Sequence, residues 1–190
     1  MDERDISTLI KLGEKIIASG QIIDDTNKLA PKLVPRPSFD DFLGDKESFA
    51  IKAAKSFIDL TSPHNLMVIY GGDKRVRQQV SITIYHETIL QNQDKDIAFA
   101  GAETLAQIES FIEEKSDILI INELQNSLLD SAKFLELLHI YMNSREKRLL
   151  LISDRHPLRL TNIDEKCKSV LQTFLIVFIL EKGRHSMIHF

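Results

Sequence analysis

A pair of glycines and a group of cationic residues mark the segment best suited to bind a phosphate. Gly71 and Gly72 follow the continuous apolar run of residues 66–70 (LMVIY), a pattern typical of a buried strand that leads into a tight turn. Three positive charges come next, on Lys74, Arg75 and Arg77. They could hold a phosphate, a nucleotide tail or a nucleic-acid backbone. The alternative is a solvated basic loop, because three charges fall short of the about 6–10 phosphate contacts of a typical DNA-binding surface.

The same segment lacks the residues that a working phosphate loop requires. Such a loop has the pattern GxxxxGK[ST], in which backbone N–H groups surround the phosphates, the lysine reaches the β and γ phosphates, and the hydroxyl binds magnesium. Counted from Gly71, the three diagnostic positions hold Val76, Arg77 and Gln78. A β-branched side chain replaces glycine, a forked guanidinium replaces an ammonium, and an amide replaces the magnesium ligand. We therefore expect no cofactor here, with binding of ATP or ADP as the alternative.

Helical and apolar segments alternate on both sides of this site. The spacing of apolar residues predicts strands over residues 66–70, 97–100, 118–121, 149–152 and 174–180, and helices over residues 47–60, 76–90, 103–114 and 131–143. Strands that are apolar throughout are buried on both faces, which predicts the α/β class: a five-stranded parallel sheet with helices on both faces. Val80, Ile82 and Ile84 alternate and favour a strand by local propensity, whereas the order of elements favours a helix there.

Composition limits the kinds of protein that this chain can be. Its 190 residues, 43% hydrophobic and 27% charged, are typical of one soluble globular domain. A net charge of -4 gives no overall basic field, and a single cysteine, Cys167, excludes an internal disulfide and suits the cytoplasm. We expect neither a secretory signal nor a membrane-spanning segment. No metal site is expected, because His185 and His189 lack a third convincing ligand.

Prolines divide the chain near its N-terminus. Residues 1–22 have helical apolar spacing and predict an amphipathic helix, which either packs on the main domain or docks in a groove of a partner. Residues 23–37 contain Pro31, Pro35 and Pro37 and predict a linker. The main domain is therefore expected to comprise residues 38–190.

Four segments, taken in order, resemble the AAA+ domain of the bacterial replication initiator DnaA and its short relative Hda. Residues 37–43 (PSFDDFL) are similar to the family's entry segment, and residues 69–72 (IYGG) to its first strand and phosphate loop. Residues 117–125 (DILIINELQ) are similar to the Walker B strand, and residues 152–157 (ISDRHP) to the end of the sensor I strand. Residues 163–179 align without gaps with the family's box VII region. The resemblance implies an AAA+ core of the P-loop NTPase type.

The chain departs from the family where the family binds and hydrolyses ATP. The acidic Walker B residue that supports magnesium is replaced by Asn122, although Glu123 follows it. Val170 falls at the arginine-finger position, with Lys166 and Lys168 at the neighbouring basic positions. The last predicted strand ends close to Phe190, so neither the helical lid nor the DNA-binding domain is expected. The resemblance thus implies a degenerate nucleotide site made of Gly71, Gly72, Arg77, Gln78, Asn122, Glu123 and Asp154.

The sequence favours a non-catalytic DnaA/Hda-like module, a pseudo-ATPase that acts by protein contact in bacterial chromosomal replication initiation. Its contact surface would be the carboxyl end of the sheet, the N-terminal helix or an AAA+ flank. The partners implied are a DnaA-type initiator, a sliding clamp or a polymerase subunit, with self-association possible and DNA contact weak or indirect. Residues 125–129 (QNSLL) faintly resemble a clamp-binding peptide.

Two rival functions remain open. One is a nucleotide-binding AAA+ regulator in which Arg77 and Glu123 still serve. The other is a nucleic-acid binder that adds a second basic cluster to the cations after Gly72, namely Arg145, Lys147 and Arg148. Asp154 and Arg155 would form a polar sensor pair in the first case and would only hold a turn otherwise.

Overall fold

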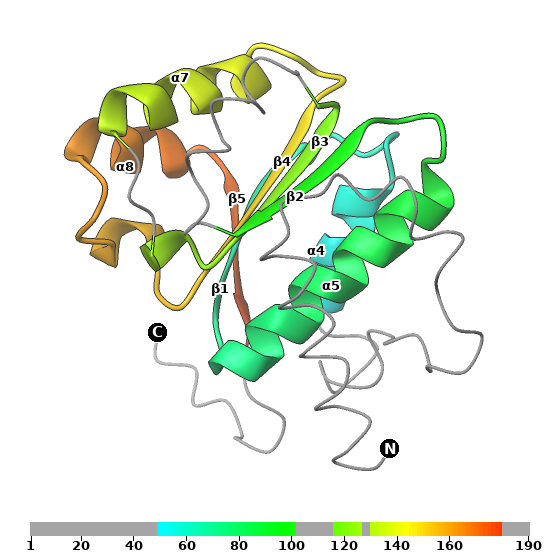
Figure 1. The fold of residues 1–190 in the computed structure, drawn as a ribbon, viewed down its shortest axis with the longest axis horizontal. Coiled ribbons are helices and arrows are strands. Elements are labelled where there is room, and N and C mark those ends of the chain that lie inside the picture. Colours follow the sequence, from blue (N-terminus) through cyan, green and yellow to red (C-terminus); the bar gives the residue numbers. More distant parts are fainter. Residues whose placement is uncertain (1–48, 102–115, 127–129, 180–190) are drawn as a thin grey trace.

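Helices and strands alternate along the chain in the computed structural model, which describes residues 49–101, 116–126 and 130–179 (Figure 1). The expected N-terminal helix 1–22, the linker 23–37 and the helix 103–114 lie outside the described residues. The expected main domain, residues 38–190, is described in its central part.

Five parallel strands form one sheet, as the apolar runs predict. They are β1 (Leu66–Gly71), β2 (Ile97–Gly101), β3 (Ile118–Asn122), β4 (Arg148–Ser153) and β5 (Leu175–Ile179). Their order across the sheet is β2-β3-β4-β1-β5, and every neighbouring pair is parallel. In β1, which lies between β4 and β5, Met67 is paired with Leu150 of β4 on one side and with Leu175 of β5 on the other. The prediction of a five-stranded parallel sheet is confirmed.

Among the described residues, two pairs of helices cover the sheet, one pair on each face (Figure 1). α4 (Phe49–Ile58) and α5 (Lys74–Gln91) pack on one face; α7 (Ser131–Met142) and α8 (Glu165–Leu171) pack on the other. Short 3-10 turns, η2 (Leu124–Asn126) and η3 (Pro157–Arg159), follow β3 and β4. None of the described helices has the length and apolar character needed to span a bilayer.

The conflict over residues 76–90 is resolved as a helix. Val80, Ile84 and Thr88 are spaced by four, so an α-helix brings all three to the same face, where they are buried against the sheet. Burial of that face outweighs the local strand propensity of β-branched residues. α5 begins at Lys74, two residues before its predicted start, because Asp73 caps it.

Helix α8 is an element that the sequence analysis did not predict. Asp164 caps its N-terminus by accepting a hydrogen bond of 2.8 Å from the Cys167 N–H. Cys167 and Leu171, one turn apart, are buried against the core on the α7 side. An Asp followed by Glu165 is a sequence signal of a helix start, but the apolar stripe is too short to stand out by periodicity.

The parallel sheet brings three polar segments to one edge. β1 ends at Gly71, β3 ends at Asn122 and β4 ends at Ser153, and these three strands are neighbours. Because parallel strands share their direction, the residues that follow them meet at the carboxyl edge of the sheet. This edge holds the residues singled out for chemistry.

Candidate functional site

The two glycines after β1 make a turn that packing requires. Gly71 and Gly72 have φ angles of +98° and +61°, in the region that favours glycine. A Cβ on Gly71 would lie 2.5 Å from a ring carbon of Phe178 and 2.8 Å from the Ile179 carbonyl oxygen. The absence of a side chain at this position therefore serves the contact with β5, with no need to invoke a phosphate.

Helix α5 begins where a phosphate loop would still be turning. Only Gly72 and Asp73 separate the end of β1 from Lys74, the first helical residue. In a GxxxxGK[ST] loop the residues between the two glycines wrap around the phosphate. Here Val76, at the position of the second glycine, already belongs to the first turn of the helix. The start of α5 therefore takes up positions that would wrap around the phosphate in a GxxxxGK[ST] loop.

The chain's own carboxylate occupies the helix end. Asp73 accepts a hydrogen bond of 2.8 Å at Oδ1 from the Val76 N–H. Free N–H groups and the positive end of the helix dipole are what make a helix N-terminus attractive to anions. Asp73 satisfies one of these N–H groups and adds a negative charge, so a phosphate at this helix end would meet electrostatic repulsion.

Arg77 is turned inward, toward β3. Its Nε donates to Glu123 Oε1 at 2.8 Å and its Nη2 donates to Glu123 Oε2 at 3.1 Å. Its Nη1 donates to the Gly72 carbonyl oxygen at 2.8 Å. Arg77 is 5% exposed, so the prediction of a solvated basic loop is wrong for this residue. Burial follows because a guanidinium forms two parallel bonds to a carboxylate that compensate for lost water.

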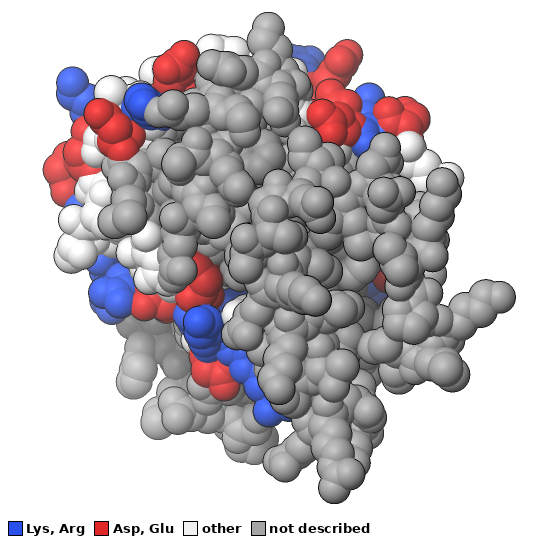
Figure 2. Space-filling model, in the orientation of Figure 1, with Lys and Arg blue, Asp and Glu red and all other residues white. Residues whose placement is uncertain are grey.

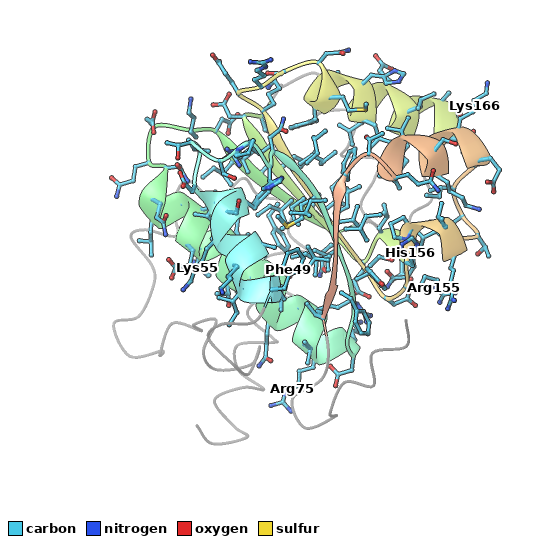
Figure 3. The ribbon with its side chains drawn as sticks, turned by 180° about the vertical axis from the view of Figure 1, so that it is seen from behind. Phe49, Lys55, Arg75, Arg155, His156 and Lys166 are labelled. Atoms are coloured by element: carbon cyan, nitrogen blue, oxygen red, sulfur yellow. The ribbon has the colours of Figure 1, made fainter. Side chains whose placement is uncertain are left out.

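Lys74 and Arg75 remain exposed on the first turn of α5. Arg75 points away from the body of the domain (Figure 3). The three cations that the sequence places together are thus divided: two face solvent on a helix and the third is neutralised inside.

Glu123 and Gln125 extend the contact of Arg77 to a third strand end. Gln125 Nε2 donates to Glu123 Oε2 at 2.6 Å, and Gln125 Oε1 accepts from the Asp154 N–H at 3.0 Å. Glu123 itself has a φ of 57°, the only positive φ recorded for a non-glycine residue in the described chain. A left-handed backbone in a residue with a long side chain persists only where the surroundings fix it. Both carboxylate oxygens of Glu123 are engaged.

Asp154 and Arg155 pair with each other beside this network. Arg155 donates from Nε and Nη2 to the two carboxylate oxygens of Asp154, at 2.8 and 2.6 Å. These hydrogen bonds lower the pKa of Asp154, and the charges of Arg155 and Arg77 lower it further. Arg155 and His156 lie at the carboxyl edge near η3 (Figure 3). The pair spans sequence neighbours, so it holds its own turn.

Solved structures with the same arrangement identify the fold. Domain III of the replication initiation protein DnaA from Thermotoga maritima matches with a TM-score of 0.62 at 23% identity, over 77% of this chain and 68% of that one. AMPPCP-bound DnaA from Aquifex aeolicus matches with a TM-score of 0.61 at 21% identity, over 78% of this chain and 51% of that one. The chain has a DnaA-like AAA+ fold.

A further solved structure has the same DnaA-like fold. The structure of DnaI matches with a TM-score of 0.58 at 14% identity, over 80% of this chain and 95% of that one. No protein-family model matches the chain, and no curated protein sequence is similar to it at a significant level. The matched region spans about half of the Aquifex DnaA chain.

The residues at the nucleotide position of this AAA+ fold do not fit magnesium nucleotide. Asn122 is buried and neutral, and its Oδ1 has no hydrogen-bond partner. Glu123, the acid that directly follows Asn122, has both oxygens bound to Arg77 or Gln125. Magnesium prefers charged oxygen ligands and keeps several waters, for which a carboxylate tied to a guanidinium leaves no open position. Within the described ranges, no group of three His, Cys, Asp or Glu could hold a metal ion.

Gln78, at the hydroxyl position of the phosphate loop, is half-buried on α5. Its backbone carbonyl accepts a hydrogen bond of 2.9 Å from the Ser81 hydroxyl. An amide at this point supplies no magnesium-ligating hydroxyl.

The box VII positions of the AAA+ fold lie on α8. Val170 is half-buried and packs against the core on the α7 side. Lys168 donates to Glu165 at 2.8 Å, and Lys166 is exposed and labelled in Figure 3. Val170 offers no charge at the arginine-finger position.

The second basic cluster lies at the other end of the sheet. Arg148, at the start of β4, is buried and donates to the backbone carbonyl oxygens of Phe57, Ser62 and His64. Lys147 Nζ donates to the Ser116 carbonyl oxygen at 2.8 Å, which leaves Arg145 as the exposed member. Figure 2 shows the described charges of both signs intermixed on one face. The prediction that Arg148 contributes to a nucleic-acid surface is wrong, because its donors hold the α4–β1 loop.

Proposed function

We propose that this chain is a non-catalytic DnaA/Hda-like protein-interaction module that acts in the initiation of bacterial chromosomal DNA replication. The fold similarity to domain III of DnaA and to DnaI supports the process. The residues at the phosphate-loop positions, Val76, Arg77 and Gln78, support a role without catalysis. The proposal goes beyond the fold, since identities under a quarter speak for architecture alone.

The observation that carries the proposal is the pairing of Arg77 with Glu123. In phosphoryl transfer the protein contributes positioning and charge: a cation on the phosphates, a metal, and a residue that orients the attacking water. Arg77 and Glu123 hold the positions of the first and third of these, and each neutralises the other. Asn122 supplies no charge for the metal. In this state neither Arg77 nor Glu123 is free to polarise a phosphate or a water.

The carboxyl edge also offers a contact surface suited to a protein partner. Phe178 of β5 is 52% exposed and Leu158 of η3 is 42% exposed. The Tyr70 ring lies 5.1 Å from the His156 ring and 5.1 Å from the Phe178 ring, measured between centroids. Aromatic and large apolar side chains beside arginine are enriched at protein interfaces. We assign partner contact to this edge surface, made of Tyr70, Arg155, His156, Leu158 and Phe178.

A DnaA-type initiator is the partner that we place first. The faint clamp-binding peptide at residues 125–129 would need a free glutamine, whereas the amide of Gln125 is bonded to Glu123 and Asp154. Residues 127–129 lie outside the described part of the chain. A sliding clamp, a polymerase subunit and a second copy of this chain are the other partners to test.

A binding experiment with matched leucine variants tests the proposal. Leu158 at the carboxyl edge and Leu90 near the end of α5 are 42% and 41% exposed. Substitution by alanine removes the same atoms from two leucines of similar exposure that lie at opposite ends of the sheet. We expect Leu158→Ala to weaken binding to a DnaA-type initiator by about tenfold, as loss of a contact residue does. Leu90→Ala is expected to leave binding unchanged.

The outcome also separates the partners. The dissociation constant should be the same with ATP, with ADP and without nucleotide, when the partner is an initiator variant that cannot bind nucleotide. Equal loss in both leucine variants would contradict the edge surface. Binding to the clamp or polymerase subunit instead of the initiator would keep the interaction module and change its partner. Binding that requires nucleotide on this chain would support the rival, a nucleotide-binding AAA+ regulator.

A further inference from the structure

We propose that Arg77 is a built-in substitute for a bound ligand: its guanidinium locks the ends of β1, β3 and β4 together, so the carboxyl edge keeps one shape without nucleotide. The lock comprises Gly72, Arg77, Glu123, Gln125 and Asp154. It rests on the proposed function in one respect, namely that no nucleotide enters the site.

The first part of the lock joins β1 to β3. Arg77 uses three of its donor groups, one on the Gly72 carbonyl oxygen at 2.8 Å and two on Glu123 at 2.8 and 3.1 Å. Gly72 follows β1 and Glu123 follows β3, and these strands are separated in the sheet by β4. One planar group therefore bridges across a strand, which a flexible ammonium with a single charge point cannot do with the same directionality.

The second part joins β3 to β4. Gln125, in η2, donates to Glu123 and accepts from the backbone N–H of Asp154, the residue after β4. The Gln125 amide thus ties Glu123 to the turn that carries Arg155 and His156. The chain of contacts ends at residues of the edge surface.

Burial makes the lock strong and makes Glu123 dependent on it. The Arg77 and Glu123 side chains are 7% and 11% exposed, so water does not screen the pair effectively. Without Arg77, the carboxylate of Glu123 would keep Gln125 as its one side-chain donor among the described residues. A nearly buried carboxylate with one donor is unstable where it lies.

The backbone of Glu123 gives a second, independent reason to assign a lock. Its φ of 57° is a conformation that a long side chain rarely adopts. Such conformations persist where the surroundings over-determine them. Bidentate capture of the side chain by Arg77 provides that constraint, and release of the side chain would free η2 to relax.

The consequence is a carboxyl edge whose shape does not depend on nucleotide. In a protein whose strand ends are organised by nucleotide, occupancy changes the population of the binding-competent shape. Here the organising cation is part of the chain. The edge surface is expected to be competent for its partner at all nucleotide concentrations.

Amide hydrogen exchange on the full chain tests the lock. The reporter is the Asp154 N–H, whose acceptor is Gln125 Oε1. We expect Arg77→Ala to speed its exchange by about tenfold or more beyond any increase at amides within α7, because the lock opens locally in addition to any loss of global stability. Lys74→Ala, an exposed cation in the same helical turn, is the matched control and should exchange as the wild type does.

Chemical rescue gives a readout that general destabilisation would not move. Ethylguanidinium, which restores the lost fork, is expected to slow Asp154 exchange in Arg77→Ala, and sodium chloride at equal ionic strength is not. If Arg77→Ala fails to fold, Arg77→Lys carries the same comparison, with a smaller increase in exchange. Unchanged Asp154 exchange, or an equal increase in all helices without rescue, would overturn the lock.

The failure of this proposal can be told apart from failure of the proposed function. The same samples are titrated with ATP and magnesium. Saturable binding to a wild type whose Asp154 is protected through Arg77 would support the rival function, a nucleotide-binding regulator; the contacts of the lock would stand, but the nucleotide-independent edge would not. No binding, together with Asp154 exchange that ignores Arg77, would refute the lock alone.

Discussion

Removing the charge of Arg77 is expected to cost more stability than any change at an exposed ion pair in this protein. Arg77→Met keeps the length and apolar stem of the side chain and removes three donors, two of them to Glu123. Breaking a buried pair by deleting one partner costs about 3–5 kcal/mol, because the other charge is left desolvated. We therefore expect the free energy of unfolding to fall by about this amount, a large part of the roughly 5–15 kcal/mol of a typical domain.

A double-mutant cycle separates the pair from the rest of the site. Glu123→Gln keeps the shape of the side chain, and the cycle with Arg77→Met should give a coupling of about 2–3 kcal/mol, as contacting buried groups do. Urea unfolding at pH 7, followed by circular dichroism, measures all four proteins. The slope with urea should stay constant, so that the midpoint alone reports stability.

The Asp154–Arg155 pair is the matched control for this cycle. It has the same bidentate geometry, with bonds of 2.8 and 2.6 Å, but Arg155 is half exposed. Solvent screening should reduce its coupling to within the error of the measurement. A coupling for Arg77 and Glu123 that is no larger than the coupling for Asp154 and Arg155 would refute the reasoning from burial.

Three further predictions follow from particular positions. Gly71→Ala should lower the free energy of unfolding by at least about 2 kcal/mol, because a Cβ there meets Phe178 at 2.5 Å at a φ of +98°. Gly72→Ala should cost less, because its nearest contact, the Val76 side chain, lies 3.2 Å away; urea unfolding compares the two variants. Burial raises the pKa of Cys167 to about 12, so the folded chain should not react with a thiol reagent at pH 8. The free energy of unfolding should fall as the pH rises above the unfolded thiol pKa of about 8.5, because there only the unfolded chain loses the proton. Reaction of the folded chain at the rate of free cysteine would contradict this prediction. The triple variant V76G/R77K/Q78T restores the GxxxxGK[ST] pattern but should not bind ATP, because α5 would still begin at Lys74 with Asp73 as its N-cap. Calorimetric titration with ATP tests this.

The sheet could be predicted because its physical cause is local. Strands buried on both faces need continuous apolar runs, and five such runs stand in the sequence at the places of β1 to β5. The start of α5 needed one more signal, an Asp in the N-cap position before Lys74, and the apolar spacing alone placed it two residues late. α8 was missed because seven residues give too few turns for a periodic signal.

The network at the carboxyl edge could not be predicted in the same way. Arg77 and Glu123 are 46 residues apart, and only the order of the strands brings them together. Set against the family that the sequence resembles, a cation, Arg77, stands at the lysine position of the phosphate loop, and an acid, Glu123, follows Asn122 in the Walker B segment. Opposite charges at these two positions are a signal of pairing that the sequence analysis did not use. Whether the seven residues of the degenerate site bind any nucleotide stays a prediction.

Equilibrium titration of the full chain with ATP and with ADP, each with and without magnesium, tests the central claim most directly. Binding would stabilise the folded state, by about 2.7 kcal/mol when the nucleotide is at about 100 times its dissociation constant, so calorimetry and thermal unfolding should agree. The closed helix end at Asp73 and the Arg77–Glu123 pair predict no saturable heat and no shift in unfolding temperature at millimolar nucleotide. Saturable, magnesium-dependent binding in the micromolar range would contradict the account.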